Sequence, residues 1–180
     1  MYKQCATEES VRRQRQLEHC LLELMLTGDY RQITISNICD RAGIARKSFY
    51  RYFSSKEGCL YALIDHAIFD GASFYLPTSH DSQALRDVFE RFFRYWKAQH
   101  ELLDALAQNT LTLLLVERIL HHAAQEEQSL WAPWSATPTV IREQTLFCLG
   151  GVMSLLLDWH QSGFQKSIQE MANILSDLIT

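Results

Sequence analysis

The stretch ITISNICDRAGIARKSFYRYF, residues 33–53, decides the fold of this chain. It predicts two short helices joined by a turn at Gly43, which supplies the positive φ that a helix end commonly needs. Thr34 can cap the first helix, because its hydroxyl accepts a hydrogen bond from an otherwise unpaired N–H of the first turn. The second helix should bury Phe49 and Phe53, which lie four positions apart on one face.

The exposed face of that second helix is basic and polar. This arrangement is typical of a helix-turn-helix whose second helix enters the major groove of DNA. Long donors at the start of such a helix reach guanine edges, and an early serine on the preceding helix can also reach a base. The residues expected to contact bases are Ser36, Arg46 and Lys47. The alternative is an ordinary helical hairpin with a solvated basic face.

A third, longer helix should follow at once. Ser54 and Glu57 have the spacing of a capping box, and the resulting helix N-terminus, with Lys56 in its first turn, is a natural phosphate site. The helix is expected to run to about Tyr75, before Pro77, and to connect the N-terminal head to the rest of the chain.

Residues 17–63 resemble the N-terminal domain of the TetR family of bacterial transcriptional regulators. The matching elements, in chain order, are Leu26–Tyr30, Ile33–Ile35, Ile38–Cys39, Arg41–Ile44, Ser48–Phe53 and Ser55–Glu57, followed by Leu60. One departure is Ala45-Arg46-Lys47, where many members carry a smaller or more polar set. The resemblance implies phosphate contacts, which position a protein on DNA without specifying sequence, by Thr34, Ser48, Tyr50, Tyr52 and Lys56.

Charge and composition agree with a two-part helical protein. The chain has 180 residues, 47% of them hydrophobic, with only 7 Gly and 3 Pro. Residues 1–58 hold 10 Lys and Arg against 7 Asp and Glu, whereas residues 59–180 hold 7 against 14, which together give the net charge of −4. The basic part is the part with the helix-turn-helix, so the asymmetry favours a nucleic-acid surface at that end.

The predicted fold is all-α, with about nine helices. Residues 1–58 form a three-helix DNA-binding domain, and residues 59–180 form a helical domain for effector binding and dimerisation. The last two helices carry strongly apolar faces, and Gly150-Gly151 in the middle of the first of them would permit close helix approach. In the TetR family these helices form the dimer interface, although an internal core is the alternative. The expected interface residues are Leu149, Val152, Met153, Leu156, Met171, Ile174, Leu175 and Leu178.

The family also implies a pocket for a small, mostly apolar effector of unknown identity. Core packing is the alternative for every aromatic residue in it. The expected pocket residues are Phe89, Phe93, Trp96, Leu106, Asn109, Leu113, Phe147 and Trp159.

Other classes of function find little support. The five cysteines show no metal-binding spacing, and their odd number without a signal peptide favours a reducing cytoplasm. No apolar run is long enough to span a bilayer. No phosphate loop, nucleophile elbow or di-metal pattern is present, so an enzyme, a metal and a cofactor are not expected. We therefore predict a cytoplasmic homodimeric repressor that an effector releases from a near-palindromic double-stranded operator. A regulator of the same fold controlled by a protein partner is the alternative.

Overall fold

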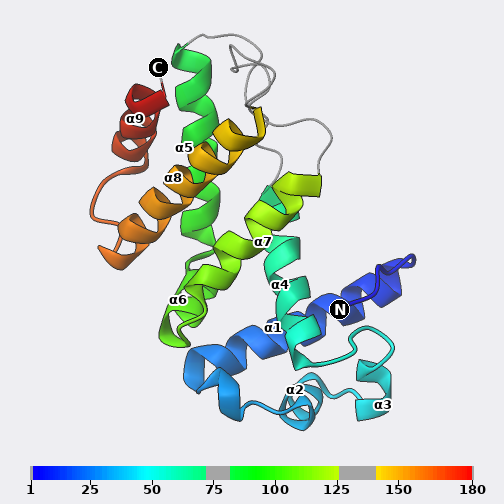
Figure 1. Ribbon diagram of the computed structural model, residues 1–180. Helices are drawn as coiled ribbons and strands as arrows, with labels where there is room; N and C mark the ends of the chain where they lie inside the picture. Colours follow the sequence, from blue (N-terminus) through cyan, green and yellow to red (C-terminus); the bar gives the residue numbers. More distant parts are fainter. Residues whose placement is uncertain (1, 72–81, 126–140, 180) are drawn as a thin grey trace. The chain divides into compact units, whose positions relative to one another are not determined.

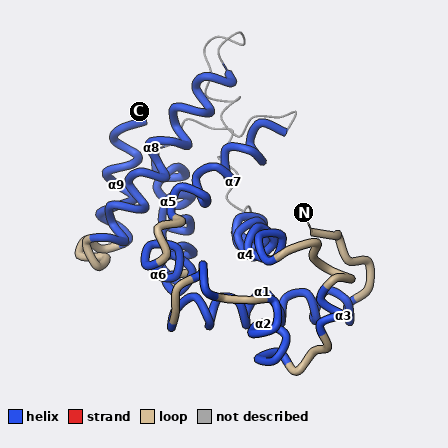
Figure 2. The backbone as a smooth tube through the Cα atoms, turned by 60° about the horizontal axis from the view of Figure 1, so that its bottom comes forward, coloured by secondary structure: helices blue, strands red, loops and turns tan. Residues whose placement is uncertain are grey.

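The structure is a computed structural model that describes residues 2–71, 82–125 and 141–179. These residues form nine α-helices and one short 3₁₀-helix, and they contain no β-strand beyond a single isolated bridge (Figures 1 and 2). The all-α prediction is confirmed. The helices are α1 (Glu8–Thr27), η1 (Tyr30–Gln32), α2 (Ile35–Ala42), α3 (Arg46–Phe49), α4 (Lys56–Gly71), α5 (Ser82–Ala98), α6 (His100–Gln108), α7 (Thr112–Gln125), α8 (Ile141–Gln161) and α9 (Ile168–Ile179).

The chain divides into two compact units. The first comprises Met1–Ala67 together with Glu101–Leu115, and the second comprises Ile68–His100 together with Val116–Thr180. The first unit therefore joins the N-terminal helices to α6, although these segments lie far apart in the sequence. The domain boundary after residue 58 remains a prediction, because it concerns the division of function along the chain.

Local sequence signals account for the helix-turn-helix in the first unit. Thr34 caps α2, where its hydroxyl accepts from the Asn37 N–H at 3.2 Å. Gly43 ends α2 with φ 63°, as the turn requires. Phe49 and Phe53 are 0% and 1% exposed, and their ring centroids lie 5.1 Å apart. The predicted cap, the turn and the burial of both rings are therefore confirmed. The expected second helix is shorter than predicted, because α3 ends at Phe49 and Phe53 lies beyond it.

The start of α4 differs from the prediction by one residue. The cap is Ser55, whose hydroxyl accepts from the Gly58 N–H at 3.2 Å, and the expected box from Ser54 to Glu57 was wrong. Either of the two adjacent serines could cap a helix with its hydroxyl. Which one does so depends on where the turn ends and the helix begins. A hydrogen bond from its own backbone N–H, together with one from the Ser55 hydroxyl, lowers the pKa of the Glu57 carboxyl. The described part of α4 ends at Gly71, and the predicted continuation to Tyr75 lies outside the described residues.

The second unit packs α5 against α9 and α8 around an aromatic core. Trp159 is 2% exposed, lies edge-on to Phe93 at 5.3 Å, and donates its indole N–H to the Lys166 carbonyl at 2.9 Å. Gly163, with φ 71°, follows the end of α8. Ser167 and Glu170 form the predicted capping box at the start of α9. The expected loop with Trp131 and Trp134 and the expected Thr137-Pro138 cap lie outside the described residues.

Among the described helices, none combines the length and the apolar character that crossing a bilayer requires.

Candidate DNA-binding site

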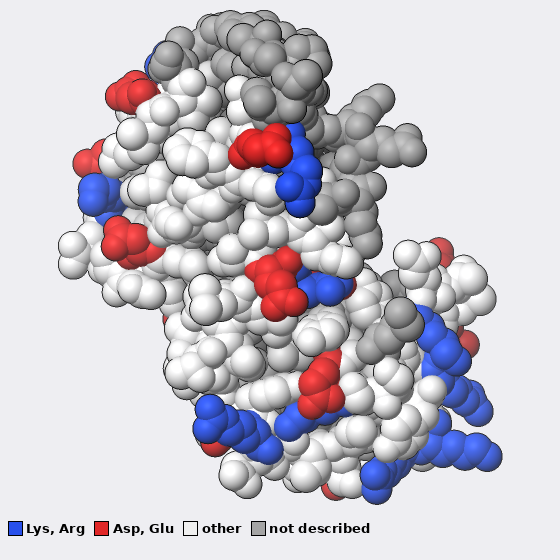
Figure 3. Space-filling model, viewed as in Figure 1, with Lys and Arg blue, Asp and Glu red and all other residues white. Residues whose placement is uncertain are grey.

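The three predicted base-contacting side chains are exposed to solvent, two of them on the short helix α3. Arg46 and Lys47 are exposed in its first turn, and Ser36 is exposed near the start of α2. The Arg46 guanidinium reaches the Tyr50 hydroxyl at 3.4 Å, which is a long contact that DNA could replace. In Figure 3, Lys and Arg side chains gather over α3 and the beginning of α1. The roles of these residues in reading bases remain predictions.

The predicted phosphate-contacting residues differ in how available their polar groups are. Tyr50 is 45% exposed, whereas Ser48 and Tyr52 are half-buried beside it. The Thr34 hydroxyl is already engaged in the cap of α2, where it also donates to the side-chain amide oxygen Oδ1 of Asn37 at 2.6 Å. The backbone N–H of Thr34 also donates to Asn37 Oδ1, at 2.8 Å, so a phosphate contact by Thr34 would require this cap to rearrange.

Lys56 is the clearest departure from the expected picture. Its ammonium group donates to the carbonyl oxygens of Tyr30 at 2.7 Å and Ile33 at 2.8 Å. It also lies 4.2 Å from the centroid of the Tyr30 ring. Two of its three N–H groups are therefore committed within the chain. A phosphate contact by Lys56 remains a prediction, but the structure gives this side chain a second task in holding the loop before α2.

Contacts from α1 hold α2 in place. The Arg41 guanidinium donates to the Glu23 carboxylate at 2.6 Å and lowers the pKa of that carboxyl. Gln16 donates its side-chain amide to the Ala42 carbonyl at 2.9 Å, which satisfies an unpaired group at the end of α2. These long-range pairs give the helix-turn-helix a fixed orientation on α1.

The residues before α1 form a strap that sequence reasoning missed. Tyr2 pairs with Phe53 in the isolated antiparallel bridge, and the Lys3 N–H donates to the Tyr52 carbonyl at 2.9 Å. The Tyr2 hydroxyl donates to the buried Asp65 carboxylate at 2.9 Å. The strap therefore ties the turn after α3 to the middle of α4. No local sequence pattern predicts this strap, because the residues that it contacts lie about fifty positions or more away along the chain.

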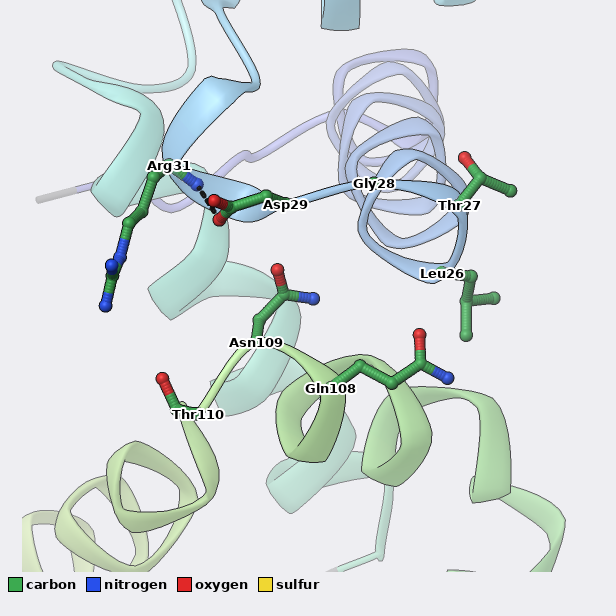
Figure 4. Close-up of a pocket in the computed structure, with 8 residues that line it drawn as sticks. All are labelled: Leu26, Thr27, Gly28, Asp29, Arg31, Gln108, Asn109 and Thr110. Atoms are coloured by element: carbon green, nitrogen blue, oxygen red, sulfur yellow. Dashed lines mark hydrogen bonds between the residues drawn. The ribbon is translucent and has the colours of Figure 1, made fainter.

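A polar cleft lies in the first unit between the end of α1 and the end of α6 (Figure 4). Its volume is about 480 Å³, and its walls are Leu26–Asp29, Arg31 and Gln108–Thr110. Asp29 caps η1 by accepting from the Arg31 N–H at 2.8 Å. The lining is mainly polar, which distinguishes this cleft from the apolar effector pocket that the sequence predicts.

The eight predicted effector residues lie in different environments. Phe89, Phe93, Trp96 and Trp159 are buried in the second unit, and Leu106 is buried in the first. Leu113 and Phe147 are 80% and 83% exposed, so the structure does not bring them into either core. Asn109 is engaged in hydrogen bonds within the first unit. The aromatic four occupy packed positions, and the pocket remains a prediction.

The predicted dimer residues also divide into two sets. Val152, Met153, Leu156, Met171 and Leu175 are buried inside their own chain. Leu178 is 69% exposed, and Leu149 and Ile174 are half-buried. A Cβ added at Gly150 or Gly151 would meet nothing within 4 Å, so these glycines are open to an approaching partner.

Comparisons with known proteins agree with the geometry. Residues 21–63 match the family described as bacterial regulatory proteins, tetR family. The HTH-type transcriptional regulator EthR of Mycolicibacterium smegmatis is 37% identical over 76 residues, which cover 39% of this chain and 35% of the relative. The matched part thus spans about a third of the length of this curated relative.

Two solved structures share the fold. The fatty acid degradation regulator FadR of Bacillus halodurans has a TM-score of 0.65 at 16% identity, covering 98% of this chain and 96% of that one. FadR of Bacillus subtilis in complex with stearoyl-CoA has a TM-score of 0.58 at 16% identity, covering 92% and 96%. The helix-turn-helix, the matched segment and the shared fold agree. Residues 21–63 therefore form a helix-turn-helix domain of the kind found in the TetR family of bacterial regulatory proteins.

Proposed function

We propose that this protein is a DNA-binding transcriptional regulator, most simply a repressor that a small-molecule effector releases from its operator. The observation that carries the proposal is the exposed face of α3, with Arg46 and Lys47 in the first turn of a helix whose other face buries Phe49. Such a helix can insert its first turn into the major groove while the rest of the head contacts the phosphates. Gel-shift titration with the DNA that flanks its own gene tests the proposal directly.

Arg46→Ala is expected to weaken operator binding about tenfold and to relax the preference at one base pair, because a bidentate contact to guanine is lost. Fluorescence anisotropy on the operator and on single-base-pair variants would measure both effects. Arg91→Ala is the matched control, since Arg91 is an exposed arginine on α5, outside the helix-turn-helix. An equal loss of affinity for the operator and for random DNA would exclude a base-reading role for Arg46.

We further propose that the protein binds a near-palindromic site as a two-fold dimer. The helix-turn-helix domains of two chains must enter successive major grooves about 34–36 Å apart. A two-fold axis between the chains allows this placement. The interface that we favour is the open face of α8 and α9. Phe147, Gly151 and Leu178 are exposed there in the single chain, and half-buried Gly150 has open space beside its Cα. The buried stripe with Leu156 serves the core of each chain and supports that face from behind.

The effector that we propose is a small, mostly apolar molecule. Since Phe93 and Trp159 pack edge-on at 5.3 Å, a ligand between α5 and α8 would have to displace these rings. Stearoyl-CoA is a suitable first probe, because it is the ligand in the structure of Bacillus subtilis FadR. A ligand at a hundred times its Kd raises the free energy of unfolding by about 2.7 kcal/mol, which a thermal-shift assay detects. If neither stearoyl-CoA nor a metabolite library shifted the melting temperature, control by a protein partner would be favoured.

A further inference from the structure

The side chain of Asn109 joins three elements of the first unit at the end of α6. Its Oδ1 accepts from the Tyr30 N–H at 2.6 Å, at the start of η1. Its Nδ2 donates to the Met25 carbonyl of α1 at 3.0 Å and to the Ala105 carbonyl of α6 at 2.8 Å. Both N–H groups and the oxygen of one amide are therefore used. Figure 4 shows Asn109 pointing from the end of α6 toward the loop that leaves α1.

Lys56 holds the same loop through different atoms. The Asn109 oxygen takes the N–H of Tyr30, and the Lys56 ammonium takes the carbonyl of the same residue at 2.7 Å. Lys56 also binds the carbonyl of Ile33, which directly precedes the Thr34 cap of α2. A continuous series of polar contacts thus runs from α6 through Tyr30 and Lys56 to the first residue of the helix-turn-helix.

Tyr30 contributes its backbone and its ring to this arrangement, and its hydroxyl contributes nothing visible. The hydroxyl oxygen is buried and has no hydrogen-bond partner among the described residues. Burial raises the pKa of Tyr30 well above its usual value, so the group stays neutral. A buried hydroxyl without a partner destabilises the fold, whereas the ring of Tyr30 makes a favourable contact with the ammonium of Lys56 at 4.2 Å.

The turn after α6 is itself strained. Thr110 has φ 57°, a left-handed conformation that a β-branched residue rarely adopts. Strain of this kind persists where surrounding contacts over-determine the backbone, and the three hydrogen bonds of the preceding Asn109 do so. The cleft of about 480 Å³ opens this turn to solvent, so the contacts can be altered from outside the core.

We propose that Asn109 and Lys56 are positioning residues that act through Tyr30 to set the helix-turn-helix for DNA binding. The proposal rests on the proposed DNA-binding function. The proposal also gives a route for regulation. The helix α6 begins at His100, only two residues after the end of α5 in the second unit, so the two helices are directly linked along the chain. A displacement of α6 would pull on the Tyr30 loop through Asn109, and Lys56 would carry the displacement to α2.

Hydrogen exchange without DNA is the first test. Asn109→Ala should speed amide exchange across residues 30–53 at least about fivefold, while the amides of α5 and α9 exchange as in the wild type. Gln108→Ala is the matched control, since Gln108 is an exposed amide on the same turn. Asn109→Asp serves if the alanine variant unfolds, because it keeps the acceptor for the Tyr30 N–H and loses the two donated bonds. Unchanged exchange in residues 30–53 with both variants would overturn the proposal.

Salt dependence separates positioning from phosphate contact at Lys56. Lys56→Met keeps the aliphatic stem and removes the charge. If Lys56 is a positioning residue, Lys56→Met should lower operator affinity about tenfold and leave the slope of log K against log salt concentration unchanged. If Lys56 instead contacts a phosphate, Lys56→Met should reduce the magnitude of that slope by about 0.9. A reduced slope with unchanged exchange in residues 30–53 would return Lys56 to the phosphate role and overturn the proposal.

A double-mutant cycle tests whether the two side chains act together. If they form one series of contacts, Asn109→Ala with Lys56→Met should lose little more operator affinity than the worse single variant. Strict additivity would overturn the link. If the wild type itself bound no flanking DNA, the proposed function would fail, while the exchange experiment would still decide the structural part.

Discussion

A chain carrying Phe147→Glu and Leu178→Glu is expected to be a monomer in light scattering and to lose operator affinity at least about a hundredfold. Phe147 and Leu178 are 83% and 69% exposed, so charge at these positions should leave the fold of each chain intact. It should oppose the approach of a second copy, because carboxylates buried between two apolar faces lose hydration without gaining a partner. A monomer binds one half-site, and the advantage of two linked heads disappears.

Leu113→Glu is the matched control for this experiment. Leu113 is 80% exposed on α7, and the same substitution there should change neither mass nor affinity. Leu156→Glu is the wrong variant for this purpose, since Leu156 is 0% exposed and a buried charge there would unfold the chain. A double variant that stayed dimeric would place the interface elsewhere.

Trp159→Ala is expected to lower the free energy of unfolding by about 3–5 kcal/mol, as for other large buried aromatic residues. The indole is 2% exposed, it packs on Phe93 and Phe164, and it donates to the Lys166 carbonyl. Removing it leaves a cavity and an unsatisfied carbonyl beside the turn to α9. Chemical denaturation followed by circular dichroism would measure the change.

Trp159→Phe separates a packing role from a pocket role. It keeps a ring against Phe93 and removes the hydrogen bond, so the loss in stability should be well below that of the alanine variant. If Trp159→Ala instead melted as the wild type does and abolished an effector response, Trp159 would line a ligand cavity as the sequence predicts.

The head of this protein was predictable from its sequence because its signals are local. A cap, a glycine turn and an aromatic pair lie within twenty residues, and each acts on its own neighbours. The choice between Ser54 and Ser55 was not predictable, because both satisfy the same chemical rule. The task of Lys56 was not predictable either, since its partners Tyr30 and Ile33 lie more than twenty residues away.

The last two helices show a different limit. The helix α8 is apolar on several sides, and its periodicity alone cannot say which stripe faces its own core. The prediction therefore combined Leu156, which is buried, with Leu178, which is exposed. Phe147 was assigned to a pocket because it is an apolar position on a helix that surrounds the effector pocket in the TetR family, but it lies on the surface. Only the packing of α8 on the rest of the second unit determines which of its faces is buried and which is exposed.

The strap formed by Tyr2 and Lys3 has a practical consequence for anyone who purifies the protein. Residues ahead of Tyr2, such as the remnant of a cleaved affinity tag, would emerge next to Phe53 and the turn that follows α3. A bulky or acidic remnant there would lie beside the surface on which DNA is proposed to bind, and it could lower affinity in a way that resembles a defective preparation. Binding measured with native and extended N-termini should therefore be compared before any operator is ranked.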